Sequence, residues 1–146
     1  MQLTNIARDV LEDAETGRRY IPSTWLAMKP SDIAKKNEED LSEVADAITK
    51  LVALADSYYK SALLGIHHIP WRSRIAIAIA LRLYRQIGIQ LVRNGTKWWY
   101  GRTIVSNKNK LMLSIFSLSD IILKNVPPHN TNLHKNLSGL AGVKKL

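Results

Sequence analysis

Residues 2 to 14 read Gln2-Leu3-Thr4-Asn5-Ile6-Ala7-Arg8-Asp9-Val10-Leu11-Glu12-Asp13-Ala14. Gln2, Asn5, Asp9 and Asp13 are spaced three or four positions apart, so the pattern predicts a helix with these oxygen-bearing side chains on one strip. An apolar face is expected to border this strip and to pack inward; its members are Leu3, Ile6, Ala7, Val10 and Ala14. The remaining side of the helix carries Thr4, Arg8 and Glu12.

Two carboxylates beside an apolar face repel each other and lose hydration, which raises the free energy unless a cation compensates them. Carboxylate and amide oxygens suit Mg²⁺, which typically binds one or two carboxylates and shares its other positions with water and substrate phosphates. The strip therefore predicts a magnesium site formed by Asp9, Asp13 and Asn5, with Gln2 as a polar contact nearby. The alternative, on spacing alone, is a solvated helix whose acids pair with Arg8, Arg18 or Arg19.

The composition is that of one globular domain, with 146 residues of which 46% are hydrophobic and 23% charged. The apolar run from Ile75 to Leu81 is far shorter than the roughly 20 residues that cross a bilayer, so we expect no spanning helix. The start shows no secretory pattern of basic and apolar regions, and the chain has no cysteine. These features predict a cytoplasmic protein without disulfides.

Charge differs sharply between the two parts of the chain. Residues 1–60 contain eight Lys and Arg against eleven Asp and Glu, whereas residues 61–146 contain thirteen against one. A cationic part of this kind suits nucleic acid, an anionic membrane surface or a diphosphate substrate. No zinc pattern, RNP-like motif or dense basic run is present, so we expect no nucleic-acid partner. Arginines alternate with apolar residues from Arg72 to Arg93, which is compatible with peripheral contact at the inner membrane surface.

Helical periodicity dominates and predicts an all-α fold. The first helix is expected to end near Thr16-Gly17, and Ser31-Asp32 is expected to cap a short second helix. Residues 1–125 are predicted to form the domain, and residues 126–146 a flexible tail. Three longer helices are predicted, from about Glu38 to Leu64, from the entry at Pro70 to about Arg93, and from about Asn107 to Lys124.

The opening stretch resembles the second aspartate-rich region of the squalene/phytoene synthase family, particularly of bacterial phytoene synthases. The resemblance extends over most of residues 2–111, through Gly17-Arg18-Arg19-Tyr20-Ile21-Pro22, Ala55-Asp56-Ser57-Tyr58-Tyr59-Lys60-Ser61-Ala62, Ile69-Pro70-Trp71-Arg72-Ser73-Arg74, Ala80-Leu81-Arg82-Leu83-Tyr84-Arg85-Gln86-Ile87-Gly88 and, more weakly, Trp99-Tyr100-Gly101-Arg102 and Ser106-Asn107-Lys108-Asn109-Lys110-Leu111. It implies the carboxyl-terminal part of an isoprenoid synthase helix bundle. It also implies a prenyltransferase that condenses two geranylgeranyl diphosphates head to head, giving phytoene through a cyclopropyl diphosphate intermediate.

The resemblance also implies roles for single residues. Asn5, Asp9 and Asp13 would bind magnesium, with manganese as an alternative ion, and NADPH is not expected. Gln2, Asn5, Arg18 and Arg102 would bind the prenyl diphosphate, and Tyr20 and Tyr84 would act in catalysis with Asp9 and Asp13. From the residues alone, Arg18 is equally a helix-end arginine, Tyr20 a half-buried aromatic and Tyr84 a core tyrosine.

Other residues receive structural interpretations. Tyr58, Tyr59 and Trp71 are predicted to pack in the core or at its rim. The adjacent His67 and His68 cannot both face one metal ion as histidines four apart on a helix can, so a metal role is not predicted for them.

One departure from the family is plain. Its members have two aspartate-rich regions on facing helices, whereas this sequence has a single Asp-x-x-x-Asp, at Asp9 and Asp13. We therefore expect a fragment, an interrupted reading frame or one piece of a split enzyme, which would associate with a missing amino-terminal half, with itself or with membranes. The alternatives are a squalene or dehydrosqualene synthase, or a non-catalytic helical assembly or membrane-associated protein of the same descent.

Overall fold

The computed structural model describes residues 1–122 and 131–137. Within these residues the chain is helical and has no strand, which confirms the predicted all-α class. The elements are α1 (Gln2–Arg8), α2 (Val10–Glu15), α3 (Pro30–Lys35), η1 (Glu38–Asp40), α4 (Leu41–Gly65), η2 (Ile66–His68), α5 (Trp71–Arg93), η3 (Trp98–Tyr100), α6 (Asn107–Ile122) and η4 (Thr131–Leu137).

The first predicted helix is present but is interrupted once, at Asp9, which separates α1 from α2. Asp9 has φ −100° and ψ 16°, outside the ideal helical values. The backbone N–H of Asp9 still donates to the Asn5 carbonyl, and that of Asp13 donates to the Asp9 carbonyl. Because the two helices remain nearly continuous, the predicted strip stays on one side, and α2 ends at Glu15 next to Thr16 as expected.

The short helix α3 begins differently from the prediction. Pro30 occupies its first turn and Lys29 is the N-cap residue, with no side-chain capping bond. Ser31 and Asp32 therefore lie inside the helix rather than before it, because a fixed φ suits proline to the start of a helix. Asp32 instead pairs with Lys35 at 2.9 Å.

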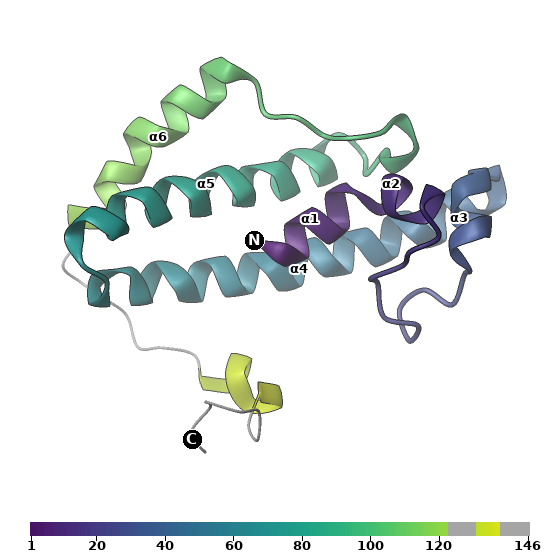
Figure 1. Ribbon diagram of the computed structural model, residues 1–146, viewed down its shortest axis with the longest axis horizontal. Helices are drawn as coiled ribbons and strands as arrows, with labels where there is room; N and C mark the ends of the chain where they lie inside the picture. The colour runs from purple at the N-terminus through teal and green to yellow at the C-terminus, as the bar shows by residue number, and fades with distance from the viewer. Residues whose placement is uncertain (123–130, 138–146) are drawn as a thin grey trace.

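The long helices α4 and α5 form an antiparallel pair, and α1 packs against both of them (Figure 1). Their close approach depends on Gly88, where an added Cβ would lie 3.1 Å from Cγ1 of Val52. The core between α1, α2, α3 and the first half of α4 contains Ala7, Val10, Leu11, Ala14, Ile21, Leu26, Ile33, Val44, Ala47, Ile48, Leu51, Leu91 and Trp98. The predicted inward face of the first helix is thereby confirmed, with Leu3 and Ile6 packed at the edge of this core.

A buried hydrogen bond ties α1 to α4. The hydroxyl groups of Thr4 and Tyr59 are 2.6 Å apart, and both side chains are buried. Tyr59 therefore packs in the core as predicted, and the hydroxyl group of Tyr58 donates to the Leu133 carbonyl of η4 at 2.9 Å. The packing prediction for Trp71 is wrong: its ring is exposed at the start of α5, with the Arg72 guanidinium carbon 5.6 Å from its centroid.

Helix α5 changes the expectation about membranes. Among the described residues it is one helix that is long and apolar enough to cross a bilayer, by length and composition only. The uninterrupted apolar run from Ile75 to Leu81 is too short to indicate such a helix, because Arg82 and Arg85 break the apolar sequence that continues beyond it. Of the 18-residue window of α5 that meets this criterion, 22% is buried inside the fold, where α5 packs against α4 and α6.

The last predicted elements fall partly outside the described residues. Helix α6 starts at Asn107 as predicted and is described to Ile122, short of the expected end at Lys124. Within the predicted tail, η4 contacts α4 through the bond from Tyr58 to Leu133, and His134 lies edge-on to Tyr58 with ring centroids 6.3 Å apart. Residues 126–130 and 138–146 lie outside the description, so the domain boundary stays a prediction.

Candidate active site

Asp9 is the centre of the candidate site and is held by two arginines. Arg8 donates from Nε to Oδ1 at 2.7 Å and from Nη2 to Oδ2 at 2.9 Å. Arg102, 93 positions further along the chain, donates in the same way at 2.8 and 3.0 Å. A carboxylate offers about four lone-pair positions, so these two paired contacts use its full capacity.

The arginines control the ionisation of Asp9. Burial alone would raise the pKa of the carboxyl, but the hydrogen bonds and charges of Arg8 and Arg102 outweigh burial and lower the pKa to about 2. Asp9 is therefore an anion at neutral pH, and its charge is compensated by protein groups.

Asp13, one turn later, has the opposite environment. Burial and the neighbouring charge of Asp9 raise the pKa of its carboxyl, while the charge of Arg18 opposes that rise. Within the part of the chain that the structure describes, its carboxylate has no hydrogen bond or ion pair. Among the described residues, the carboxylate oxygens of Asp13 therefore have no hydrogen-bond donor.

Asn5 completes the acidic strip, a name kept here for Asn5, Asp9 and Asp13. Its Oδ1 atom is buried without a hydrogen-bond partner, which is costly unless something outside the described residues satisfies it. Gln2, the fourth residue of the predicted set, is exposed on the first turn of α1. The described residues contain no group of three or more His, Cys, Asp and Glu able to hold a metal ion.

The donor chemistry of the acidic strip fits magnesium. The orphaned Asn5 oxygen and the unpaired Asp13 carboxylate are hard oxygen donors, as this ion requires. Asp9 can join them only if one arginine withdraws. Arg102 is the one suited to leave, since its bonds are the longer pair and its side chain is 46% exposed against 18% for Arg8.

The position of Arg102 follows from the segment before α6. The buried indole of Trp98 donates to the Leu41 carbonyl at 3.3 Å and fixes η3 against the start of α4. Gly101 then turns the chain with φ +91°, a conformation that side chains beyond glycine rarely adopt. Arg102 follows directly and contacts Asp9, so the conformation of this loop positions the Arg102 side chain for the contact.

A pocket of about 420 Å³ lies beside Asp9 and is called here the arginine pocket. Its cationic and hydroxyl groups come from Arg8, Tyr84, Arg102 and Lys110, and Leu83, Ile87 and residues 103–105 complete the wall. The structure thus brings the predicted Tyr84 and Arg102 together with the acidic strip. Sequence reasoning missed Lys110, although its charge and its place in a motif that resembles the family were available signals. It named Arg8 only as a possible partner of the acids, a pairing that Arg8 makes with Asp9.

Arg18 and Tyr20 lie beside Asp13 but outside the arginine pocket. They line a separate, very small cleft with Asp13, Ile6, Val10 and Ile33, and Tyr20 is exposed. The backbone N–H of Arg18 donates to the Asp13 carbonyl at 2.8 Å, as a residue at a helix end does. Its neighbour Arg19 instead has a structural role, since its Nη1 donates to the carbonyls of Leu26 and Met28 at 2.8 and 2.7 Å.

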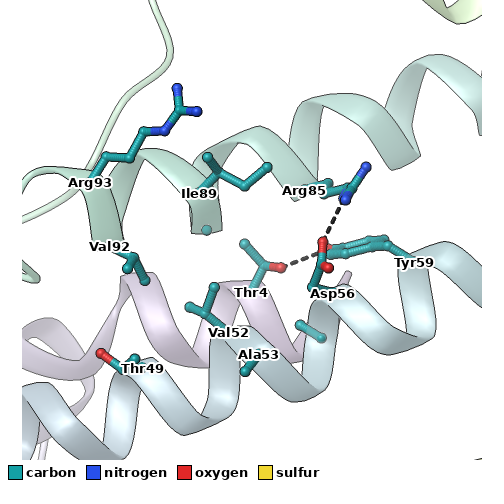
Figure 2. Close-up of a pocket in the computed structure, with 12 residues that line it drawn as sticks. Thr4, Thr49, Val52, Ala53, Asp56, Tyr59, Arg85, Ile89, Val92 and Arg93 are labelled. Carbon is teal, nitrogen blue, oxygen red and sulfur yellow. Dashed lines mark hydrogen bonds and ion pairs between the residues drawn. The ribbon is translucent and has the colours of Figure 1, made fainter.

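A second hollow of about 340 Å³ runs between α4 and α5 (Figure 2). Its wall is largely apolar, and the Thr4–Tyr59 bond lies inside it. Arg85 closes one side by donating from Nε to Oδ1 of Asp56 at 2.6 Å, and Lys60 lies 2.8 Å from the other oxygen. These contacts join the two long helices that support the acidic strip.

Comparison with known proteins identifies the family of the chain. The family model described as Squalene/phytoene synthase matches residues 1–109. The chain belongs to the squalene/phytoene synthase family. It is 41% identical over 132 residues to the 15-cis-phytoene synthase of Enterobacter agglomerans, covering 88% of this chain and 44% of that protein. It is 36% identical over 132 residues to the 15-cis-phytoene synthase of Pantoea ananas, covering 88% and 42%.

A third relative, the phytoene synthase of Cereibacter sphaeroides, is 34% identical over 140 residues, covering 92% of this chain and 38% of that protein. The chain therefore spans less than half the length of these relatives. No solved structure matches the chain.

Proposed function

We propose that this chain provides the carboxyl-terminal part of a phytoene synthase. The reaction first joins two geranylgeranyl diphosphates head to head to a cyclopropyl diphosphate, with loss of one diphosphate and one proton. This intermediate then loses its own diphosphate, rearranges and loses a second proton to give phytoene. The observation that carries the proposal is that Arg8, Tyr84 and Arg102 line one pocket beside Asp9. The relatives named phytoene synthase support the choice of this product within the family.

The arginine pocket supplies what a departing diphosphate needs. Arg8, Arg102 and Lys110 present fixed positive charge, and guanidinium groups bind phosphate oxygens by paired hydrogen bonds. The hydroxyl group of Tyr84 is placed to donate to a leaving oxygen in the same pocket. The apolar side chains of Leu83 and Ile87 exclude water, which would otherwise capture the allylic cation.

Asn5, Asp9 and Asp13 would hold magnesium, or manganese in its place, next to that pocket. When bound, the ion neutralises charge on the diphosphate and so favours its departure. Arg102 would exchange its contact with Asp9 for one with the diphosphate, which frees the carboxylate and moves the cation to the place where negative charge develops. NADPH takes no part in the proposed reaction.

The test is co-expression of this chain with a polypeptide that covers the remaining, amino-terminal part of a relative. Supplied with geranylgeranyl diphosphate and magnesium but no NADPH, the assembled protein should yield phytoene, identified by mass and ultraviolet absorption. The same assembly with both Asp9→Asn and Asp13→Asn is the control and should yield none. The chain alone should catalyse nothing detectable.

Other outcomes would support one of the two alternative functions. A strict requirement for NADPH, or use of farnesyl diphosphate alone, would move the assignment to squalene or dehydrosqualene synthesis. A folded assembly that releases no diphosphate from any prenyl substrate would indicate a non-catalytic protein of the same descent.

A further inference from the structure

The hollow of about 340 Å³ between α4 and α5 is called here the α4–α5 groove (Figure 2). Its volume is that of a small-molecule site. Among the residues that the structure describes, it shares none of its lining with the arginine pocket. Thr4 lines the groove from α1, on a different side of that helix from Asn5 and Asp9. The groove is therefore separate from the candidate active site.

The polar groups inside the groove already have protein partners. The hydroxyl groups of Thr4 and Tyr59 are 2.6 Å apart, and the Thr49 hydroxyl donates to a carbonyl of its own helix at 2.8 Å. The Asp56 carboxylate accepts from Arg85 at 2.6 Å, and a lysine binds its other oxygen at 2.8 Å. A polar group of a ligand would lose its hydration here without gaining a free partner. The interior of the groove therefore fits an apolar body.

The charge of the groove is unbalanced at one end. The charged side chains among its described lining residues are Asp56, Arg85 and Arg93. Asp56 pairs with Arg85, whereas Arg93 is exposed and has no hydrogen bond or ion pair within the described part of the chain. A guanidinium group binds carboxylate or phosphate oxygens by paired hydrogen bonds. The end of the groove at Arg93 therefore fits an anionic head group.

The two arginines also set the length of the ligand. Arg85 and Arg93 are eight positions apart on α5. At 1.5 Å per residue this separation is ~12 Å along the helix, about the length of a chain of ten carbon atoms. The wall between them is formed by small or apolar residues, among them Val52, Gly88 and Ile89.

We propose that the α4–α5 groove binds an amphiphile of about ten carbon atoms with a single anionic head. The chain lies along the wall between α4 and α5, and the head binds Arg93 at the open end. A fatty acid and a prenyl phosphate share this chemistry. A bound chain would contact Thr4 and thus the helix that carries the acidic strip on another side. The proposal does not depend on the proposed reaction.

The first test compares decanoate with decanol, which have the same chain and differ in the charge of the head. Dissociation constants are measured on the purified chain by calorimetric titration. Decanoate should bind at least tenfold more tightly than decanol. Arg93→Gln should weaken decanoate binding at least fivefold and leave decanol binding unchanged. Arg72→Gln makes the same substitution at an exposed residue of the other end of α5 and should change neither value.

The second test fills the groove. Ala53 is an exposed residue of α4 that lines it, so Ala53→Phe should weaken binding of both ligands at least tenfold without disturbing the core. Ala27→Phe adds the same ring at an exposed residue just before α3 and should leave both dissociation constants unchanged. Circular dichroism of each variant checks that its helices are intact.

Nuclear magnetic resonance of methyl groups locates the bound chain. Decanoate should shift the methyl signals of Val52, Ile89 and Val92, which line the groove. It should leave those of Leu111 and Ile115 unchanged, which are exposed on α6 and would report non-specific binding. Geranyl phosphate in place of decanoate distinguishes the two sources of the ligand, and the one that binds more tightly at the same methyl groups is assigned to the groove.

Three results would overturn the proposal. One is equal affinity for decanoate and decanol together with no effect of Arg93→Gln. Another is a set of methyl shifts on α6 in place of the groove, or binding that survives Ala53→Phe. The third is loss of decanoate binding when the amino-terminal part of a relative is bound, which would assign the groove to that polypeptide.

Discussion

Helices α1 and α6 both pack against α5, but they differ in which of their side chains are buried. Helix α1 buries Ala7 and Thr4 and, through the Thr4–Tyr59 bond, becomes part of the core. Among the side chains of α6 that the structure describes, Ser117 is buried and Leu111, Met112, Ile115 and Phe116, called here the apolar stripe, are exposed. The difference indicates that the chain completes its own core around the acidic strip, whereas α6 presents a surface to something outside the described fold.

The comparison also separates two kinds of charge. Near α1 and α2, the guanidinium groups of Arg8 and Arg102 donate to the Asp9 carboxylate at 3.0 Å or less. These opposite charges are therefore paired within the molecule. At the start of α6, Lys108 and Lys110 stand among residues without an acid, so their charge is directed outward. The predictions below test whether the region of α1 and α2 carries chemistry and stability while α6 carries neither.

The largest effect is expected at the acidic strip. In the assembled protein, Asp9→Asn or Asp13→Asn should lower turnover at least a hundredfold, because each removes charge that would anchor the metal ion and its diphosphate. The measurement is phytoene formed per unit time with magnesium in excess. Glu12→Gln is the matched control: this neighbouring acid is exposed and lies 3.4 Å from Arg102, and its loss should change turnover less than threefold. Equal losses in all three variants would show a general charge effect instead of a site.

The next effect is on stability and uses one residue type in both regions. Ile48→Ala should lower the free energy of unfolding by about 2–5 kcal/mol, because its side chain is wholly buried and its loss leaves a cavity. Ile115→Ala should change it by less than about 0.5 kcal/mol, because the exposed stripe makes few contacts in the folded chain. Urea unfolding followed by circular dichroism measures both values. A cost at Ile115 close to that at Ile48 would mean that α6 belongs to the core.

Much of this arrangement can be predicted from local sequence. Periodicity predicts α4 and α5 because their apolar positions recur at helical spacing over many turns. The four-residue spacing predicts that Asp9 and Asp13 share a side, and that holds despite the interruption between α1 and α2. Both inferences depend only on neighbours along the chain.

Long-range contacts could not be predicted in this way. No local pattern indicates that Arg102 reaches Asp9, since the contact depends on how Trp98 and Gly101 fold the loop against α4. Thr4 falls on the outer side by periodicity but is buried, because Tyr59 from another helix offers its hydroxyl group a partner. Periodicity also cannot predict that the apolar stripe is exposed, because it identifies an apolar face but not what covers that face.

A smaller effect is expected where α1 meets α4. Tyr59→Phe removes the hydroxyl that pairs with Thr4 and should lower the free energy of unfolding by about 1 kcal/mol, more if the Thr4 hydroxyl finds no other partner. Tyr58→Phe is the control, since its half-buried hydroxyl bonds a carbonyl of η4, and it should cost less. If the order were reversed, the attachment of η4 would matter more than the anchoring of α1.

The smallest effect concerns acid and separates the two carboxylates. Because the folded-state pKa of Asp9 is about 2, below the ordinary value of 3.8, its ionisation stabilises the fold above about pH 4, and that contribution is lost as the pH falls toward 2. Asp13 acts in the opposite sense: its pKa is raised, so protonation at low pH relieves an unfavourable charge and stabilises the fold. Asp9→Asn should therefore flatten the fall in unfolding free energy between about pH 4 and pH 2. Asp13→Asn should instead act just above pH 4, where it removes the gain in unfolding free energy that protonation of Asp13 gives as the pH falls. Asp46→Asn, at an exposed residue of α4, controls for overall charge. The measurement is the midpoint of urea unfolding at a series of pH values from neutral pH to pH 2. The same pH profile for both site variants would mean that Arg8 and Arg102 do not make the pKa of Asp9 differ from that of Asp13.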